Sequence, residues 1–137
     1  MPMNRALKGS FLFIALIVAS CMEAGGGGAV HHPPPAIKRD AFTPLELELS
    51  AVNPHGSMSR RMTSIRCHYR LSGSTEFISL PMVPSDVDSR RLIARCNLPP
   101  FPAGTQGSVE YYFDFQFDGP HYNQYNSPES PIRVPIN

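Results

Sequence analysis

Residues 109–118 carry the pattern that most restricts the fold of this chain. Five apolar side chains, from Val109 to Phe117, alternate strictly with side chains such as Glu110 and Asp114. A period of two places successive side chains on opposite faces of a β-strand, whereas an α-helix repeats every 3.6 residues. We therefore expect one face of this strand to be buried and the other to meet water.

The same alternation recurs along the chain and predicts an all-β domain. Clusters of Pro, Gly, Ser and Asn separate the alternating segments, as expected for turns between short strands. The runs at residues 77–83 and 132–136 contain proline, which cannot donate a ladder hydrogen bond and is therefore confined to sheet edges or bulges. The predicted strands cover residues 45–50, 64–71, 77–83, 91–98, 109–118 and 132–136.

This strand pattern resembles that of an immunoglobulin-like domain over residues 43–137. The resemblance implies a single antiparallel β-sandwich and says nothing about activity. The chain departs from true immunoglobulin domains because it contains no Trp. The interval between Cys67 and Cys96 is also too short for the usual pairing of the second and sixth strands. We therefore predict the architecture and not membership of the family.

Residues 1–20 are typical of a secretory signal peptide. Arg5 and Lys8 precede an apolar run at residues 11–18, and small residues then lead to Cys21. This run is too short to cross a bilayer as a helix, which takes about 20 residues. We expect the segment to be removed from the mature protein.

The residues Val18, Ala19, Ser20 and Cys21 resemble the lipobox of bacterial lipoproteins. This resemblance implies that Cys21 receives a diacylglycerol thioether, that the chain is cut before it, and that the new amino terminus is acylated, typically with palmitate. It also implies a lipid anchor in the bacterial cell envelope. Under enterobacterial sorting rules, Met22 after the cysteine implies the outer membrane.

Residues 21–42 are predicted to form a flexible tether between the anchor and the domain. This segment is rich in glycine at residues 25–28 and in proline at residues 33–35, and few of its side chains can bury surface. A coil of about 20 residues has a root-mean-square reach on the order of 25 Å. We therefore expect the domain to stand clear of the lipid.

The cysteine count fits an exported protein. Of the 3 cysteines, Cys21 is assigned to the lipobox, which leaves Cys67 and Cys96. Each lies on the apolar side of its predicted strand, and a disulfide is the default expectation in an oxidising compartment. Closing a loop of about 29 residues stabilises the fold by roughly 3.5 kcal/mol in the chain-entropy description.

Charge and motifs exclude several classes of function. Lys and Arg total 12 and Asp and Glu total 11, with no run of one sign, so we expect no nucleic-acid partner. No nucleophile turn accompanies the histidines, and we predict that the protein is not an enzyme. The pair His31 and His32 and the pair Asp86 and Asp88 offer too few ligands for zinc or calcium, so we predict no metal site and no cofactor.

The segment at residues 119–128 is the most site-like part of the sequence. It combines Tyr, Asn, Gln and Ser, which supply large contact area and adaptable hydrogen bonds in the binding loops of sandwich domains. It is also longer than the two to five residues usual for a hairpin connection. The alternative is an ordered turn whose tyrosines pack back on the sheet. The candidate binding residues are His121, Tyr122, Asn123, Tyr125 and Asn126.

These features predict a non-enzymatic envelope lipoprotein that binds another envelope protein, as an accessory or assembly component of a membrane protein complex. By fold-level analogy it resembles the pilotins and assembly factors of bacterial secretion systems. The alternative is a carbohydrate-binding module, because residues 109–134 resemble the last strand pair of glycogen- and starch-binding modules. Tyr112, Tyr122 and Tyr125 would then replace the usual tryptophans. A third hypothesis is that the loop at residues 120–127 inhibits a hostile hydrolase.

Overall fold

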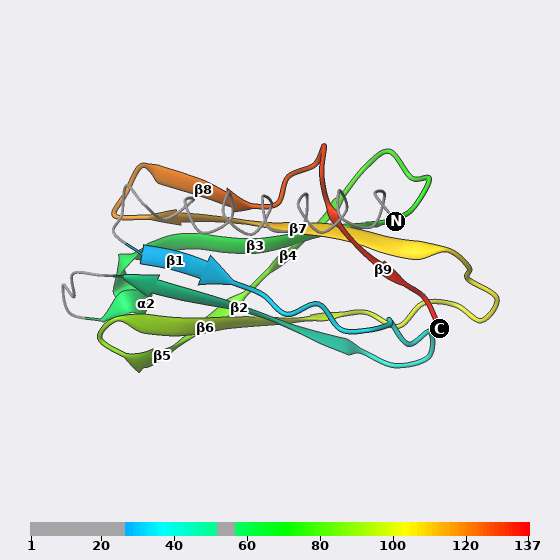
Figure 1. Ribbon diagram of the computed structural model, residues 1–137, viewed down its shortest axis with the longest axis horizontal. Helices are drawn as coiled ribbons and strands as arrows, with labels where there is room; N and C mark the ends of the chain where they lie inside the picture. Colours follow the sequence, from blue (N-terminus) through cyan, green and yellow to red (C-terminus); the bar gives the residue numbers. More distant parts are fainter. Residues whose placement is uncertain (1–26, 52–56) are drawn as a thin grey trace, which may run out of the picture.

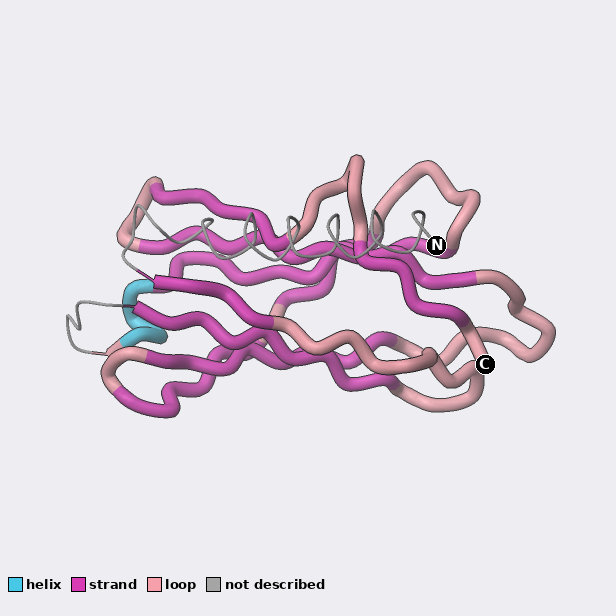
Figure 2. The backbone as a smooth tube through the Cα atoms, in the orientation of Figure 1, coloured by secondary structure: helices cyan, strands magenta, loops and turns pink. Residues whose placement is uncertain are grey.

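The computed structural model of the chain describes residues 27–51 and 57–137, and the predicted signal peptide, Cys21 and residues 22–26 lie outside this part. The described residues form two antiparallel sheets that pack face to face (Figure 1). The strands run along the long axis, and most of the turns between them lie toward the two ends (Figure 2). The predicted all-β sandwich is confirmed.

The first sheet has four strands in the order β1-β2-β6-β5. These strands are β1 (Gly27–Val30), β2 (Thr43–Ala51), β6 (Arg91–Leu98) and β5 (Val83–Asp88). In the central pair, Leu45, Leu47 and Leu49 of β2 face Cys96, Ala94 and Leu92 of β6, respectively. The alternation predicted for both segments therefore places apolar side chains opposite each other on one face.

The second sheet has five strands, in the order β4-β3-β7-β8, with β9 also paired to β7. Strand β8 pairs with residues 113–117 of β7 and β9 pairs with residues 108–111, so the two strands share one edge of β7. A short helix, α2 (Met58–Arg61), leads into this sheet. The strands are β3 (Met62–Leu71), β4 (Ile78–Pro81), β7 (Ser108–Phe117), β8 (His121–Tyr125) and β9 (Ile132–Pro135).

The strand order matches an immunoglobulin-like sandwich. The four-stranded sheet has the arrangement A-B-E-D, and the second sheet has the arrangement C′-C-F-G, with β8 and β9 in the place of strand G. Both proline-containing runs lie at sheet edges, as predicted. The run at residues 77–83 divides between the sheets, because β4 ends at Pro81 and the chain continues as β5 in the other sheet. Met82 at this crossing is buried, and its N–H donates to the carbonyl of Ile65 at 2.9 Å.

The core lies between the sheets and consists mainly of the apolar positions predicted by the alternation. Strand β7 contributes Val109, Tyr111, Phe113, Phe115 and Phe117, all buried. Four of these side chains are aromatic, and each removes on the order of 150 to 250 Å² from water when it is buried. Strand β7 therefore contributes more buried area to the core than any other strand. The largest fully buried side chains are those of Tyr111, Phe113, Phe115, Ile37, Leu45, Leu47, Leu49, Leu92, Leu98, Val109 and Cys67.

The prediction that residues 21–42 form a tether is wrong for residues 27–42. Strand β1 pairs with β2, with Gly27 opposite Ala51 and Val30 opposite Glu48. Ile37 is fully buried, and its N–H donates to the carbonyl of Pro135 at 2.8 Å. Glycine and proline in this segment are compatible with an edge strand and an extended connection, because backbone hydrogen bonds and one apolar anchor hold it to the sheets.

Candidate functional site

The outward side of the five-stranded sheet carries a connected set of polar and aromatic side chains, which we call the outer sheet face. Its register follows from the pairing of β3 with β7, which places His68 opposite Tyr112 and Arg70 opposite Glu110. These positions alternate with the core residues of the same strands, so the alternation that builds the core also builds this face. The outer sheet face comprises His68, Arg70, Phe77, Ser79, Glu110, Tyr112, Asp114, Tyr122, Gln124 and Arg133.

Tyr112 lies at the centre of the outer sheet face and is only 9% exposed. The ring of His68 stacks on it with centroids 4.7 Å apart, and the ring of Phe77 meets it edge-on at 5.0 Å. The guanidinium of Arg70 lies 4.2 Å from the centroid of Phe77. Burial raises the pKa of the Tyr112 hydroxyl above its usual range. These contacts fix an aromatic platform on a surface that sheets commonly leave polar.

A row of polar contacts crosses four strands of the sheet, from β4 to β8. The Nδ1 atom of His68 lies 2.7 Å from the hydroxyl of Ser79, and its Nε2 atom lies 2.9 Å from Asp114 Oδ1. The hydroxyl of Tyr122 donates to Asp114 Oδ2 at 2.9 Å, and Gln124 Nε2 donates to the same hydroxyl at 3.3 Å. Burial and the bond to Asp114 raise the pKa of Tyr122. The row therefore holds five side chains in fixed positions relative to one another.

Ser79, His68 and Asp114 are connected in the same order as the serine, histidine and aspartate of a hydrolytic triad. A hydrolase binds its substrate in a hollow next to the nucleophile. Three hollows of about 270 to 280 Å³ in the described part are lined by other residues, among them Val30 and Ile93, Tyr69 and Phe101, and Met62 and Pro84. None of these three hollows is lined by Ser79, His68 or Asp114.

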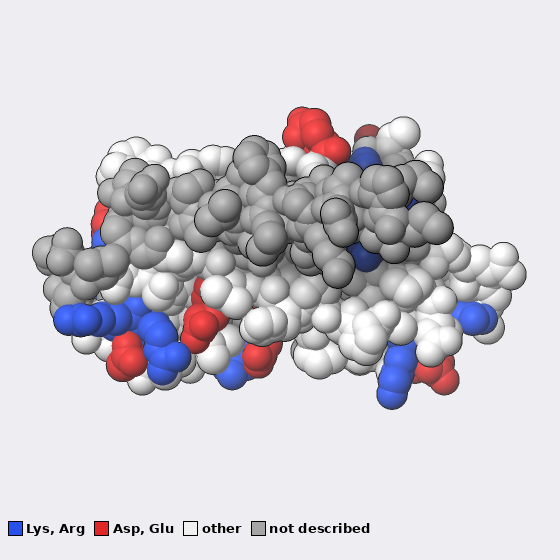
Figure 3. Space-filling view, viewed as in Figure 1, with Lys and Arg blue, Asp and Glu red and all other residues white. Residues whose placement is uncertain are grey.

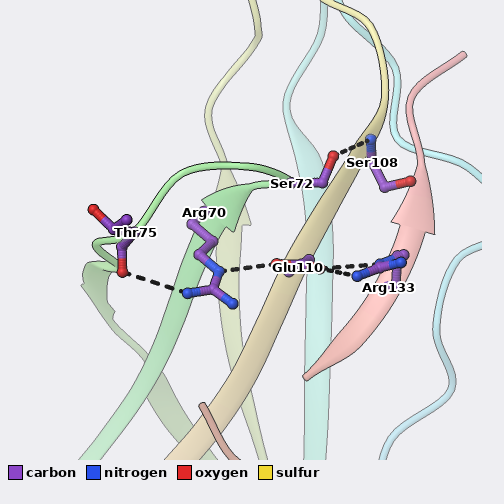
Figure 4. A network of polar contacts seen from close by, with 6 residues as sticks. All are labelled: Arg70, Ser72, Thr75, Ser108, Glu110 and Arg133. Atoms are coloured by element: carbon purple, nitrogen blue, oxygen red, sulfur yellow. Dashed lines mark hydrogen bonds and ion pairs between the residues drawn. The ribbon is translucent and has the colours of Figure 1, made fainter. Parts of the chain in front are cut away.

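Glu110 forms the second network of the outer sheet face (Figure 4). Its side chain is 5% exposed and accepts hydrogen bonds from Arg70 Nε at 2.9 Å and from Arg133 Nε at 3.0 Å. The hydrogen bonds from Arg133 and then from Arg70 lower the pKa of this carboxyl group. Arg70 also donates to the carbonyl of Thr75 at 3.4 Å. Sequence analysis did not single out Glu110, because its partners on β3 and β9 become visible only once the strand register is known.

The prediction of a long binding loop at residues 119–128 is wrong. His121–Tyr125 forms strand β8, joined to β7 by a short turn in which Asp118 and Gly119 have positive φ angles of 49° and 80°. Glycine adopts this conformation without strain, and aspartate tolerates it. The alternation of aromatic and amide side chains in the segment belongs to a strand with one outward row, Tyr122 and Gln124, and one inward row.

The structure separates the five predicted binding residues. Only Tyr122 takes part in the outer sheet face, where it is 55% exposed. Asn123 is opposite Phe115 on the inward row, and His121 stacks on Phe117 with ring centroids 5.5 Å apart. Asn126 donates from its side chain to the carbonyl of Ser130 at 3.0 Å and so stabilises the connection to β9.

Tyr125 belongs to a buried cluster around His31, at the gap between β1 and β8. The Nδ1 atom of His31 lies 2.6 Å from the carbonyl of Glu46, and Nε2 lies 2.6 Å from the hydroxyl of Tyr111. A carbonyl requires a donor, so Nδ1 carries the proton and Nε2 accepts from Tyr111. The hydroxyl of Tyr125 contacts the backbone of His31 at 3.3 to 3.4 Å. Burial lowers the pKa of His31, so the stabilisation by this cluster is present above the unfolded pKa and lost as the pH falls.

Cys67 and Cys96 lie on inward positions of opposite sheets, in β3 and β6. Cys67 is buried and Cys96 is half-buried, and both are free thiols. Interaction with the thiol of Cys96, and then burial, raises the pKa of Cys67. Interaction with Cys67 lowers the pKa of Cys96. The sequence-based prediction that the two side chains point into the same core agrees with this position.

No three His, Cys, Asp or Glu side chains of residues 27–51 and 57–137 are grouped as metal ligands would be. The described part also contains no helix with the length and apolar character needed to cross a bilayer. A comparison of the chain with models of protein families finds no match, and a comparison with curated proteins finds none either. The class of the protein is therefore defined by its fold, an immunoglobulin-like β-sandwich with a structured outer sheet face.

Proposed function

We propose that this protein is a lipid-anchored, non-enzymatic binding domain of the bacterial cell envelope. In this proposal it serves as an accessory component of a membrane protein complex, and its partner binds to the outer sheet face. The observation that carries the proposal is the pair of networks around Tyr112 and Glu110, which hold polar and aromatic side chains in fixed positions on an outward surface.

Ordered side chains favour binding because association costs less when they do not have to be immobilised. Tyr and Arg are also enriched among the residues that dominate protein interfaces. Tyr122 combines both properties, since its ring is 55% exposed while its hydroxyl is held by Asp114. We expect Tyr122 and the exposed guanidinium of Arg133 to make the first contacts with the partner.

The lipid anchor is part of the same proposal and depends on Cys21. The lipobox lies in residues 18–21, outside the described part. Mass spectrometry of the mature protein should find residues 1–20 removed and a diacylglycerol-modified, acylated Cys21. In the Cys21→Ser variant, lipid labelling should be lost. A mature protein without acyl groups would contradict the anchor and the proposed place at the outer membrane.

We also propose that Cys67 and Cys96 form a disulfide after export. The motivation is that the two cysteines lie on inward positions of strands in opposite sheets, and that each thiol shifts the pKa of the other. Mass spectrometry without reductant should show the two peptides joined, and reduction should lower the free energy of unfolding by roughly 3.5 kcal/mol. Free thiols in protein isolated from the envelope would contradict this pairing.

Crosslinking followed by purification tests the binding function. A defined envelope protein should copurify with the wild-type chain and be lost, or reduced at least about fivefold, in the Tyr122→Ala variant, since interface tyrosines often contribute more than about 1 kcal/mol. The matched control is Glu46→Ala on the opposite sheet, which should retain the partner. Equal recovery with both variants would contradict the assignment of the outer sheet face.

A carbohydrate-binding function is the second candidate, and it is favoured by one observation. Tyr122 presents an exposed ring flanked by the carboxylate of Asp114 and the amide of Gln124. Sugars stack on aromatic rings and bond to such polar groups. A glycan array should therefore show binding that the Tyr122→Ala variant loses and Tyr122→Phe retains in part. A blank array on the folded protein would remove this candidate.

A further inference from the structure

Strand β1 begins at one end of the sandwich, which we call the β1 end. Gly27 is opposite Ala51, and the N–H of Ala51 donates to the carbonyl of Arg90 in the β5–β6 turn at 2.7 Å. The N–H of Asp118 in the β7–β8 turn donates to the carbonyl of Arg61 in α2 at 2.8 Å. Figure 1 shows β1, α2 and the β5–β6 turn together at the left of the molecule. The loop at residues 99–107 lies at the other end.

The chain between Cys21 and the β1 end is short. Gly27 follows Cys21 by 6 residues, which span at most about 20 Å when fully extended. Strand β7, with 10 residues, is about 33 Å long at the usual rise per residue. An acyl chain on Cys21 would therefore keep the β1 end within about 20 Å of the bilayer surface, whereas the loop at residues 99–107 can lie one sandwich length farther away.

The β1 end carries four arginines, Arg60, Arg61, Arg90 and Arg91, against three aspartates, and Glu48 of β2 also pairs with Arg91 at 3.2 Å. Its acidic groups are engaged within the protein: Asp118 pairs with Arg61 at 2.6 Å, and Asp88 lies 3.4 Å from Arg91. The carboxylate of Asp86 accepts bonds from Ser57 and Ser59, and Arg60 acts on it only at longer range.

The guanidinium groups of Arg60 and Arg90 are exposed and form no ion pair with any described residue. Figure 3 shows basic side chains at this end of the molecule, with acidic side chains beside them.

We infer that the β1 end faces the membrane and that Arg60 and Arg90 contact the head groups of anionic phospholipids. The inference rests on the proposed acylation of Cys21, because the short connection is what fixes this end near the lipid. Attraction between arginine and anionic head groups acts over about one Debye length, roughly 10 Å at 0.1 M salt, which the connection allows. The outer sheet face then stands upright beside the bilayer and is open to a partner.

The absence of tryptophan from the sequence allows a direct test. Ser89→Trp places a single tryptophan in the exposed β5–β6 turn, and Ala103→Trp places one in the exposed loop at the other end. Each full-length lipidated variant is reconstituted into vesicles that contain phosphatidylglycerol and a small fraction of dansyl-labelled lipid, and energy transfer from tryptophan to dansyl is measured. Transfer should be several-fold more efficient from Ser89→Trp. Equal transfer, or stronger transfer from Ala103→Trp, would overturn the orientation.

Two further measurements distinguish a failure of the proposed orientation from a failure of the proposed acylation of Cys21. If mass spectrometry finds no acyl group on Cys21, both are wrong; if the acyl group is present and transfer is equal, only the orientation is wrong. In the Ser89→Trp background, the double change Arg60→Gln and Arg90→Gln should reduce transfer at low salt, and the control Lys38→Gln should not. Unchanged transfer in the double variant would overturn the head-group contact of the arginines.

Discussion

The two outward faces of the sandwich differ in how their charged side chains are held. On the four-stranded sheet, Glu46 pairs with Arg95 at 2.6 Å, with both side chains more than half exposed. On the five-stranded sheet, Glu110 is 5% exposed and bridges Arg70 and Arg133. The first face is an ordinary solvated surface, and the second has the buried, mutually supporting contacts of an ordered site.

The difference in exposure between the two sets of ion pairs predicts a difference in their contribution to stability. Exposed ion pairs contribute about 0 to 1 kcal/mol, because water screens both charges and the long side chains lose entropy when they pair. A buried charged group that loses its partners carries a larger penalty, since it cannot return to water. The comparison therefore predicts that equivalent substitutions will have unequal effects on the two faces.

The largest difference is expected for Tyr112. Tyr112→Ala removes a ring that packs against His68 and Phe77, and should lower the free energy of unfolding by about 2 to 3 kcal/mol. The matched change on the other face, Ile93→Ala, should cost about 1 kcal/mol because Ile93 is only half-buried. Urea unfolding with an unchanged m-value measures both. Equal costs would remove the distinction between the faces.

A smaller difference is expected for the two glutamates. Glu110→Gln should destabilise the fold by about 1 to 2 kcal/mol, because two arginines lose a charged acceptor. Glu46→Gln should change stability by less than about 0.5 kcal/mol. The same urea titrations, made at low and high salt, should show salt dependence mainly for the exposed pair. A neutral Glu110→Gln variant would show that the network in Figure 4 is not stabilising.

The dependence of the free energy of unfolding on acidic pH tests the same comparison between the two faces. The arginines lower the pKa of Glu110 in the folded state, so its contribution is present above the unfolded pKa of about 4.3 and is lost as the pH falls through the folded value. The stability difference between wild type and Glu110→Gln should therefore shrink as the pH is lowered from neutral to below the unfolded pKa. Unfolding midpoints in urea across this range measure it, and a constant difference would contradict the account.

The smallest effect is expected for Arg95. Arg95→Gln breaks the exposed pair with Glu46 and should alter the free energy of unfolding by less than about 0.5 kcal/mol. Thermal unfolding should give a midpoint within a few degrees of wild type. A loss above 1 kcal/mol would mean that the four-stranded face is more highly organised than its exposure indicates.

The sequence predicted the core better than it predicted the site. The alternation in β7 identified Tyr111, Phe113 and Phe115 as core residues, because burial on one face leaves a period of two in the residue types. The proline-containing edge strands followed from the missing N–H of proline. These features are local, and each can be read without knowing which strands are neighbours.

The missed elements lack such a local signal. Strand β1 contains Gly27 and Gly28, which pair through the backbone and show no alternation of side chains. In β8, Tyr122 faces outward and Tyr125 inward, so residue type does not mark the buried row. The partners of Glu110 lie on β3 and β9, far apart in sequence, and only the register brings them together.

Site-specific photocrosslinking in the native cell is the most direct test of the central claim. A photoreactive residue replaces Gln124 on the outer sheet face in one variant and Asn97 on the four-stranded face in another, both in the full-length chain. The account predicts a crosslink to one defined envelope protein from position 124 and none to it from position 97. The same crosslinks from both positions, or a partner captured only from position 97, would contradict it.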